Sequence, residues 1–137
     1  MNTQDVETID IEGDKLEAIF KRQNELIAKY HVIESDNGFV FPKEIPLNLD
    51  SPQAQLRLKE FAWRITEELA EAMSCLKNKP WKSTHMETDK SHYFEELADA
   101  FHFFVEMVIL SGLDANGLTD IYFRKSEVNK FRQRSNY

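Results

Sequence analysis

Two pairs of acidic residues, each spaced for one face of a helix, constrain this chain more than any other feature. The first pair is an ExxE pattern, Glu68 and Glu71, and the second is an ExxD pattern, Glu96 and Asp99. Residues three apart share one face of a helix. Four carboxylates on facing helices repel one another strongly unless a cation lies between them. The pattern therefore favours two packed helices that hold a cation.

A solvated acidic surface is the alternative interpretation, because glutamate is a good helix former on exposed faces. The apolar surroundings of the acids weigh against it. Leu69-Ala70 separates the first pair and Leu97-Ala98 separates the second. An acid in such apolar surroundings is costly unless it is paired or bound to a metal ion. We therefore predict a metal site at these acids.

The ligand atoms favour Mg²⁺, with Mn²⁺ as a substitute, because hard divalent ions prefer carboxylate oxygens and often bind together with substrate phosphates. A di-iron carboxylate bundle is the competing metal chemistry, and it needs two Glu-x-x-His motifs. This chain offers one near-match, from Asp99 to His102, and no second. His102 has a further interpretation, as a core histidine that donates to a backbone carbonyl or a carboxylate.

Composition limits the class of protein. The chain has 137 residues, 42% of them hydrophobic, and its 24 acids against 17 Lys and Arg give a net charge of −7. That charge argues against a dedicated nucleic-acid backbone binder. The single cysteine, Cys75, excludes an internal disulfide and fits a reducing compartment. No apolar run reaches the ~18–20 residues of a membrane span, and the acidic start lacks the apolar region of a signal peptide. We expect a cytoplasmic protein with no membrane contact, in the host cytoplasm if the chain is viral.

Apolar residues at helical spacing predict four helices. They cover residues 14–30, 52–77, 91–111 and 114–131. Ser51-Pro52 is a good helix opening, with a capping residue followed by proline at the first helical position. Gly112 suits a left-handed cap at the end of the third helix.

The segments between the helices lack helical periodicity. Residues 31–49 and 78–90 are predicted to be irregular, and residues 1–12 to be a flexible lead. Residues 13–137 then form a single domain. The predicted fold class is all-α, of the four-helix-bundle type, in which facing helices build a site in the core.

The predicted fourth helix offers the positive charge that the acidic pairs lack. Lys125, Asn129 and Arg132 are spaced i, i+4 and i+7, so they share one helical face. Lysine and arginine bind phosphate oxygens. The alternative is a solvated terminal helix whose cations interact favourably with its C-terminal end.

Gln23, a polar residue on an apolar stripe, is either a satisfied core amide or a group that recognises a base.

The order of these motifs resembles the dimeric dUTPase family. That order is Gln23, ExxE, Trp81-Lys82, ExxD leading into His102-Phe103-Phe104, and then Lys125, Asn129, Arg132 and Tyr137. The family belongs to the all-α nucleoside triphosphate pyrophosphatases, together with MazG, and the chain is most similar to the phage dCTP/dUTP pyrophosphatases. The resemblance covers about residues 15–137, and the tail motif makes it more specific than the acidic pairs alone.

The resemblance implies an enzyme that cleaves a deoxynucleoside triphosphate, dUTP or dCTP, to the monophosphate and pyrophosphate. Its metal ligands would be Glu68, Glu71, Glu96 and Asp99, holding about two or three Mg²⁺ ions. Glu68 or Glu71 would also orient or deprotonate the attacking water. The substrate-binding residues implied are Lys82, Lys125 and Arg132 for the phosphates, Gln23 and Asn129 for the nucleoside, Trp81 and His102 near the base or sugar, and Tyr137 at the end of the tail.

The resemblance also implies a homodimer, or a tetramer, in which the partner subunit helps to complete each site. The biological role would be sanitation of the nucleotide pool. Leu26-Ile27 stands where the family often has Leu-Asn, so the base that the site selects stays open.

One alternative is a MazG-like pyrophosphatase of other or broad base specificity, including purine nucleotides. Another is a catalytically silent helical module that uses the acidic face to bind a partner.

Overall fold

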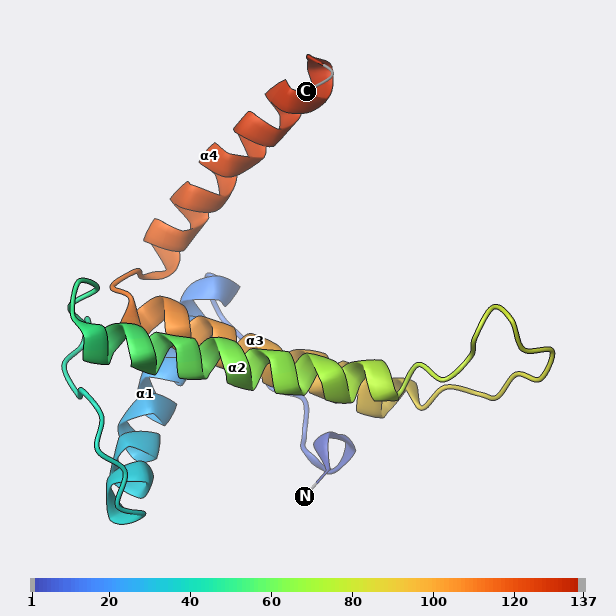
Figure 1. The fold of residues 1–137 in the computed structure, drawn as a ribbon, viewed down its shortest axis with the longest axis horizontal. Coiled ribbons are helices and arrows are strands. Elements are labelled where there is room, and N and C mark those ends of the chain that lie inside the picture. The colour runs from blue at the N-terminus through green and yellow to red at the C-terminus, as the bar shows by residue number, and fades with distance from the viewer. Residues whose placement is uncertain (1, 136–137) are drawn as a thin grey trace.

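The chain folds into helices, as a computed structural model of it shows for residues 2–135 (Figure 1). The long helices are α1 (Lys15–Asp36), α2 (Pro52–Ser74), α3 (Lys90–Leu110) and α4 (Ala115–Arg134), and a short 3-10 turn, η1 (Thr3–Asp5), precedes them. The described residues contain no strand. The all-α prediction is confirmed.

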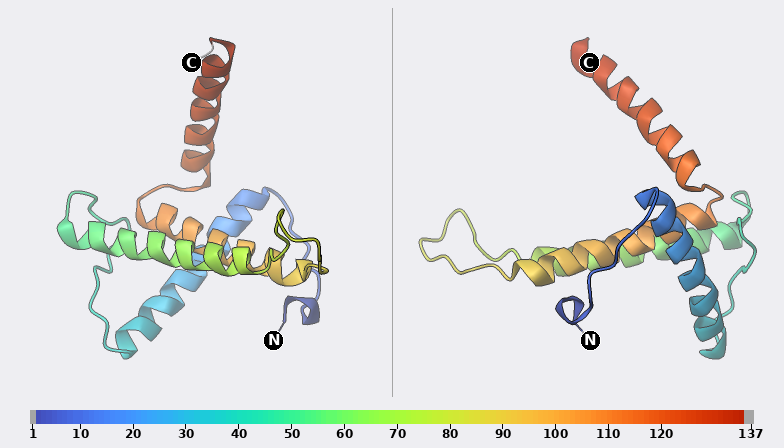
Figure 2. Two further views of the ribbon diagram at one scale, coloured as in Figure 1. Left: turned by 45° about the vertical axis from the view of Figure 1, so that its right-hand side comes forward. Right: turned by 180° about the vertical axis from the view of Figure 1, so that it is seen from behind.

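The antiparallel pair α2 and α3 forms the centre of the fold. These helices lie side by side, α1 crosses α3, and α4 projects away from the other three (Figures 1 and 2). The chain between α2 and α3, residues 75–89, extends beyond the ends of both helices (Figure 1). Within one chain the helices therefore do not close into a four-helix bundle. The bundle and the oligomer stay predictions for an assembly of several chains.

Short polar side chains fix where the helices begin. The capping residues are Asp14, Ser51, Asp89 and Asp114, and each accepts a hydrogen bond from the backbone N–H three residues later, at 2.8, 3.5, 3.1 and 2.7 Å respectively. A cap of this kind contributes about 1 kcal/mol to stability. The predicted opening at Ser51-Pro52 is confirmed. Gly112 has a φ of +98°, so the predicted left-handed cap after α3 is confirmed as well.

Three helix ends differ from the prediction by three residues or more. The sequence predicted that the first helix ends at residue 30, whereas α1 continues to Asp36. A carboxylate oxygen of Glu34 lies 2.7 Å from the buried guanidinium of Arg57 on α2, and the ring of His31 packs on Phe41 at 5.1 Å between centroids. These tertiary contacts stabilise the last turns, which local sequence signals could not indicate. Helix α2 ends at Ser74 rather than at residue 77, and α4 ends at Arg134 rather than at residue 131.

Helix α3 contributes to two apolar clusters and so fixes its neighbours. The first cluster joins α3 to α1 and α4 through Phe20, Ile27, Val105, Val108, Ile109 and Ala115. The second joins α3 to α2 through Leu47, Ala54, Phe61 and Leu110. Because the same helix packs into both clusters, the polar side chains that α3 carries are held against α1 on one side and α2 on the other.

Many predicted apolar positions remain exposed on the single chain. On α3, Phe94 is 59% exposed and Phe101 is 43% exposed, and Ala115 is the one buried residue of α4. Exposed apolar surface of this extent is typical of surfaces that bind another protein. None of the described helices combines the length and the apolar character that a membrane span requires.

Phe61 is fully buried in the second cluster, so its truncation tests the packing of α2 on α3. We expect Phe61→Ala to lower the free energy of unfolding by about 3–5 kcal/mol, because it removes buried apolar contacts and leaves a cavity. Chemical denaturation measures the change. Phe39→Ala is the matched control, since Phe39 is 66% exposed. Equal losses in the two variants would contradict the packing described.

Candidate functional site

Three carboxylates meet where α2 packs on α3. Ligand oxygens of Glu68 on α2, and of Glu96 and Asp99 on α3, all lie within 4.8 Å of one another. Glu71, one turn along α2 from Glu68, also lies in contact with the Glu96 carboxyl. The ExxE and ExxD pairs therefore face each other across the helix pair. We call these four residues the acidic cluster.

The carboxylates of the acidic cluster perturb one another. Burial, followed by contact with the Glu96 carboxyl and the charge of Glu71, raises the pKa of Glu68 to about 7. Contact with Glu96 also raises the pKa of Glu71, and burial raises that of Asp99. The pKa of Glu96 is lowered, chiefly because the Glu68 carboxyl donates a hydrogen bond to it when protonated. A divalent cation between the carboxylates would relieve the repulsion that these shifts reflect.

Glu96 is the most buried member of the acidic cluster. Its Oε1 lies 2.9 Å from Nε2 of His92. Its Oε2 is buried and has no hydrogen-bond partner among the described residues, unless a neighbouring carboxyl carries a proton. A buried carboxylate oxygen without a partner is costly. The residues present thus fit a hard divalent cation such as Mg²⁺, which this all-oxygen set suits.

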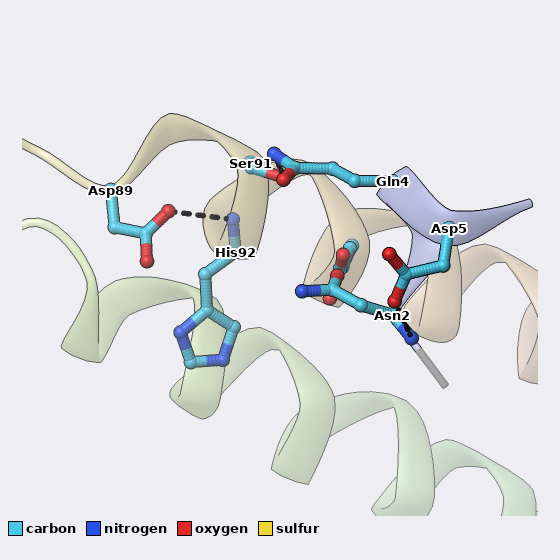
Figure 3. Close-up of a pocket in the computed structure, with 7 residues that line it drawn as sticks. Asn2, Gln4, Asp5, Asp89, Ser91 and His92 are labelled. Carbon is cyan, nitrogen blue, oxygen red and sulfur yellow. Dashed lines mark hydrogen bonds between the residues drawn. The ribbon is translucent and has the colours of Figure 1, made fainter.

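The N-terminal segment lies against the start of α3 (Figure 3). Gln4 Nε2 donates to Ser91 Oγ at 3.0 Å, and the Thr3 hydroxyl donates to the Glu95 carboxylate. Figure 3 also shows the ring of His92 pointing away from this segment, toward α2. The contacts separate two adjacent acids, because Glu95 binds the N-terminal segment while Glu96 faces α2.

A cleft of about 460 Å³ opens beside the acidic cluster, among α1, α2 and α3. Its walls are Gln23, Leu26, Tyr30, Ile33, Glu34, Arg64, Glu68, Asp99, His102, Phe103 and Glu106. Because α2 and α3 are antiparallel, Glu68 and Asp99 lie at one end of the cleft, while Arg64 and Glu106 lie further along it. The cleft therefore joins the acidic cluster to a second group of polar residues.

Gln23 and Glu106 form a buried polar pair between α1 and α3. Gln23 Nε2 donates to Glu106 Oε1 at 3.3 Å, and the two residues are 3% and 1% exposed. Burial raises the pKa of Glu106 to about 7, although the charges of Arg57 and Arg64 oppose the rise. Oε2 of Glu106 is buried without a hydrogen-bond partner in the described part of the chain. Gln23 is thus a partly satisfied core amide that also lines the cleft.

Two arginines of α2 support the wall of the cleft. Arg57 is buried and lies 2.7 Å from one carboxylate oxygen of Glu34, while Arg64 lies 3.4 Å from the other. The guanidinium of Arg64 also lies over the ring of Phe61, at 4.8 Å from its centroid, and over that of Phe103, at 5.8 Å. Glu34 therefore ties the end of α1 to α2 and holds one wall of the cleft in place.

Most of the other predicted site residues lie away from the cleft in a single chain. His102 does line it, and its Nδ1 lies 2.8 Å from the carbonyl oxygen of Ala98. The residues placed elsewhere are Trp81 and Lys82, in the loop beyond α2 and α3, and Lys125, Asn129 and Arg132, on the projecting helix α4 (Figure 1). Tyr137 lies outside the described residues. One chain thus unites the acids with Gln23 and His102 but not with the predicted phosphate-binding cations.

Sequence reasoning missed two polar residues that line the cleft, Arg64 and Glu106, and the buried Arg57 near them. Glu106 is the one acid in the apolar run 103–110, and it follows Asp99 by seven residues, which places both on one helical face. Arg57 and Arg64 are likewise seven residues apart. Extending the helical-face test from the acidic pairs to these positions would have found all three.

Comparison of the chain with protein-family models, with curated proteins and with solved structures finds no match. What the site does is therefore inferred from its own residues.

The buried Glu106 gives stability a pH dependence with a definite sign. Its pKa is about 7 in the folded chain against an ordinary value of 4.5, so its contribution to stability is full below pH 4.5 and is lost as the pH rises to about 7. We expect Glu106→Gln to raise the free energy of unfolding at about pH 8 by about 3 kcal/mol, and to change it little at pH 4.5. Denaturant unfolding at the two pH values measures this. Glu25→Gln, at an exposed position of α1, is the control and should show neither effect. A stability difference for Glu106→Gln that does not vary with pH would contradict the burial described.

Proposed function

We propose that this chain is a Mg²⁺-dependent hydrolase that cleaves deoxynucleoside triphosphates to the monophosphate and pyrophosphate, with dUTP or dCTP as substrate. The observation that carries the proposal is the close approach of Glu68, Glu96 and Asp99, with ligand oxygens within 4.8 Å, at the mouth of a cleft. Without a cation this approach is repulsive. The motif resemblance to the dimeric dUTPase family supplies the substrate class.

The four members of the acidic cluster are the residues that hold the ion, Mg²⁺ or in its place Mn²⁺. When bound, the ion supplies neutralisation of the triphosphate charge and a lowered pKa for coordinated water. Glu68 or Glu71 orients the attacking water and accepts its proton. The water oxygen bonds to phosphorus, the phosphoanhydride bond breaks, and pyrophosphate leaves. No covalent enzyme intermediate is needed, and Gln23 contacts the nucleoside further along the cleft.

A second copy of the chain completes the site in this proposal. The cations that would hold the phosphates, Lys125 and Arg132, are carried by α4, which projects from its own chain (Figure 1). Apolar side chains that are exposed on the single chain would be buried against another copy. They are Phe101 and Phe104 on α3 and Ile121, Phe123 and Phe131 on α4. Charge complementarity between a basic helix and an acidic cluster favours the same pairing.

The activity itself gives the first test. We expect pyrophosphate release from dUTP or dCTP with Mg²⁺ and none with EDTA. Glu96→Gln should lower the rate at least about a hundredfold. Mutation of a residue that only supports a metal ligand lowers activity by up to about a hundredfold, and Glu96 would itself be a ligand. Glu67→Gln is the control, since Glu67 is exposed and adjoins the acidic cluster in sequence. Circular dichroism shows whether each variant is folded.

Other outcomes of the same assay separate the alternatives. Release confined to purine nucleotides would indicate a MazG-like enzyme of different base specificity. Absence of release from every nucleotide, by folded protein with Mg²⁺ present, would contradict the enzyme proposal.

The contribution of the second copy is testable by subunit complementation. Glu96→Gln removes an acid and Lys125→Ala removes a cation, so each variant alone should be impaired at every site. If the two groups come from different chains, a refolded mixture forms mixed dimers in which one site has both groups intact. We expect activity to reappear in the mixture, as measured by pyrophosphate release. A mixture no more active than its components would indicate that each chain builds its own site.

A further inference from the structure

The two carboxylate oxygens of Glu96 have different surroundings. Glu96 is 8% exposed. Its Oε1 lies 2.9 Å from Nε2 of His92, which is one turn earlier on α3. Its Oε2 has no hydrogen-bond partner among residues 2–135 while the neighbouring carboxyls are ionised. A side chain outside the acidic cluster therefore holds one end of this carboxylate, and nothing but other acids adjoins the other end.

The hydrogen bond between His92 and Glu96 has a defined direction. An ionised carboxylate can only accept, so Nε2 of His92 carries the hydrogen and donates it. The backbone of His92 is fixed as well, because Asp89 Oδ1 accepts from the His92 backbone N–H at 3.1 Å. Figure 3 shows this second hydrogen bond, with the His92 ring directed toward α2. The donor is thus held at the edge of the acidic cluster.

The charges around Glu96 oppose the orientation that its carboxylate has. Glu68 and Glu71 contact it from α2, and like charges at contact distance repel. In the part of the chain that the structure describes, His92 is the one hydrogen-bonding partner of Glu96 that is not an acid. Without this donor, the carboxylate would lower its energy by turning away from the other acids toward solvent.

We propose that His92 is a positioning residue for the metal site, because its Nε2–H donates to Glu96 and keeps that carboxylate facing Glu68 where the ion binds. This inference rests on the proposed function, since it concerns the metal site on which that function depends. Hydrogen bonds of this kind orient carboxylates that bind a metal, and removal of the partner typically lowers metal affinity about 10- to 100-fold. His92 acts through Glu96 and is not itself a ligand.

Mn²⁺ affinity without nucleotide, followed by the free-ion signal in electron paramagnetic resonance, tests the role of His92. His92→Phe keeps a ring and removes the donor, so we expect its affinity to be about 10- to 100-fold below that of wild type. His92→Gln places an amide N–H about as far from the backbone as the histidine Nε2–H, so it should recover most of the affinity. His85→Phe, at an exposed position between α2 and α3, is the matched control and should bind as wild type does.

Two results of this titration would overturn the inference. One is wild-type affinity in His92→Phe. The other is an affinity of His92→Gln as low as that of His92→Phe, because that result would indicate that the imidazole nitrogen binds the ion directly. If His92→Phe does not fold, His92→Ala removes the donor with a smaller side chain and takes its place in the comparison.

Unfolding measurements separate positioning of a ligand from support of the fold. The His92 side chain is 54% exposed, so we expect His92→Phe to unfold in EDTA at the same denaturant concentration as wild type. Mn²⁺ should stabilise wild type by binding the folded chain, and should stabilise His92→Phe much less at the same concentration. A variant that is less stable in EDTA, yet gains as much from Mn²⁺ as wild type, would overturn the inference in favour of a structural role.

Failure of the proposed function is distinguishable from failure of this inference. If wild type binds Mn²⁺ and hydrolyses no nucleotide, the proposed hydrolase fails, and the affinities of the His92 variants still decide on His92. If nucleotides are hydrolysed and His92→Phe binds Mn²⁺ as wild type does, the hydrolase stands and the inference is overturned. Wild-type protein that binds no Mn²⁺ would overturn both.

Discussion

Repulsion among carboxylates held between α2 and α3 is the constraint on which the rest of the structure depends. The apolar cluster around Phe61 and Leu110 fixes the two helices against each other, and this packing forces Glu68 and Glu96 together. A bound cation would convert that repulsion into attraction. Because the ion would bind the folded chain and not the unfolded one, it would also stabilise the fold by mass action. Metal binding at these four side chains would therefore be coupled to the stability of the fold.

The second polar group, around Glu106, differs from the acidic cluster in its physical role. The acidic cluster holds several carboxylates close together, so a cation between them would lower their mutual repulsion. Glu106 is a single buried acid with one internal donor, Gln23, and the charges of Arg57 and Arg64 act on it. Helix α3 carries both groups on one face, with Asp99 and Glu106 seven residues apart. A single helix thus sets the spacing between the acidic cluster and the buried pair of Gln23 and Glu106.

Local features of the fold could be predicted from sequence, and features that depend on distant contacts could not. Ser51-Pro52 announces the start of α2 because capping involves only neighbouring residues. The shared face of each acidic pair follows from helical geometry alone. The continuation of α1 to Asp36 depends on the ion pair between Glu34 and Arg57, which no local pattern contains. The direction of α4 depends on which surface, in the same chain or in another, its apolar side chains pack against, and no local pattern contains that surface.

Binding of Mn²⁺ to the purified protein, followed by the loss of the free-ion signal in electron paramagnetic resonance, tests the central claim most directly. It examines the acidic cluster without assuming a substrate or a base. We expect saturable binding that Mg²⁺ reverses by competition and that is lost in a folded Glu68→Gln, Glu96→Gln double variant. Wild-type protein that binds no Mn²⁺, or a double variant that binds it as tightly as wild type, would contradict the assignment of these carboxylates as a metal site.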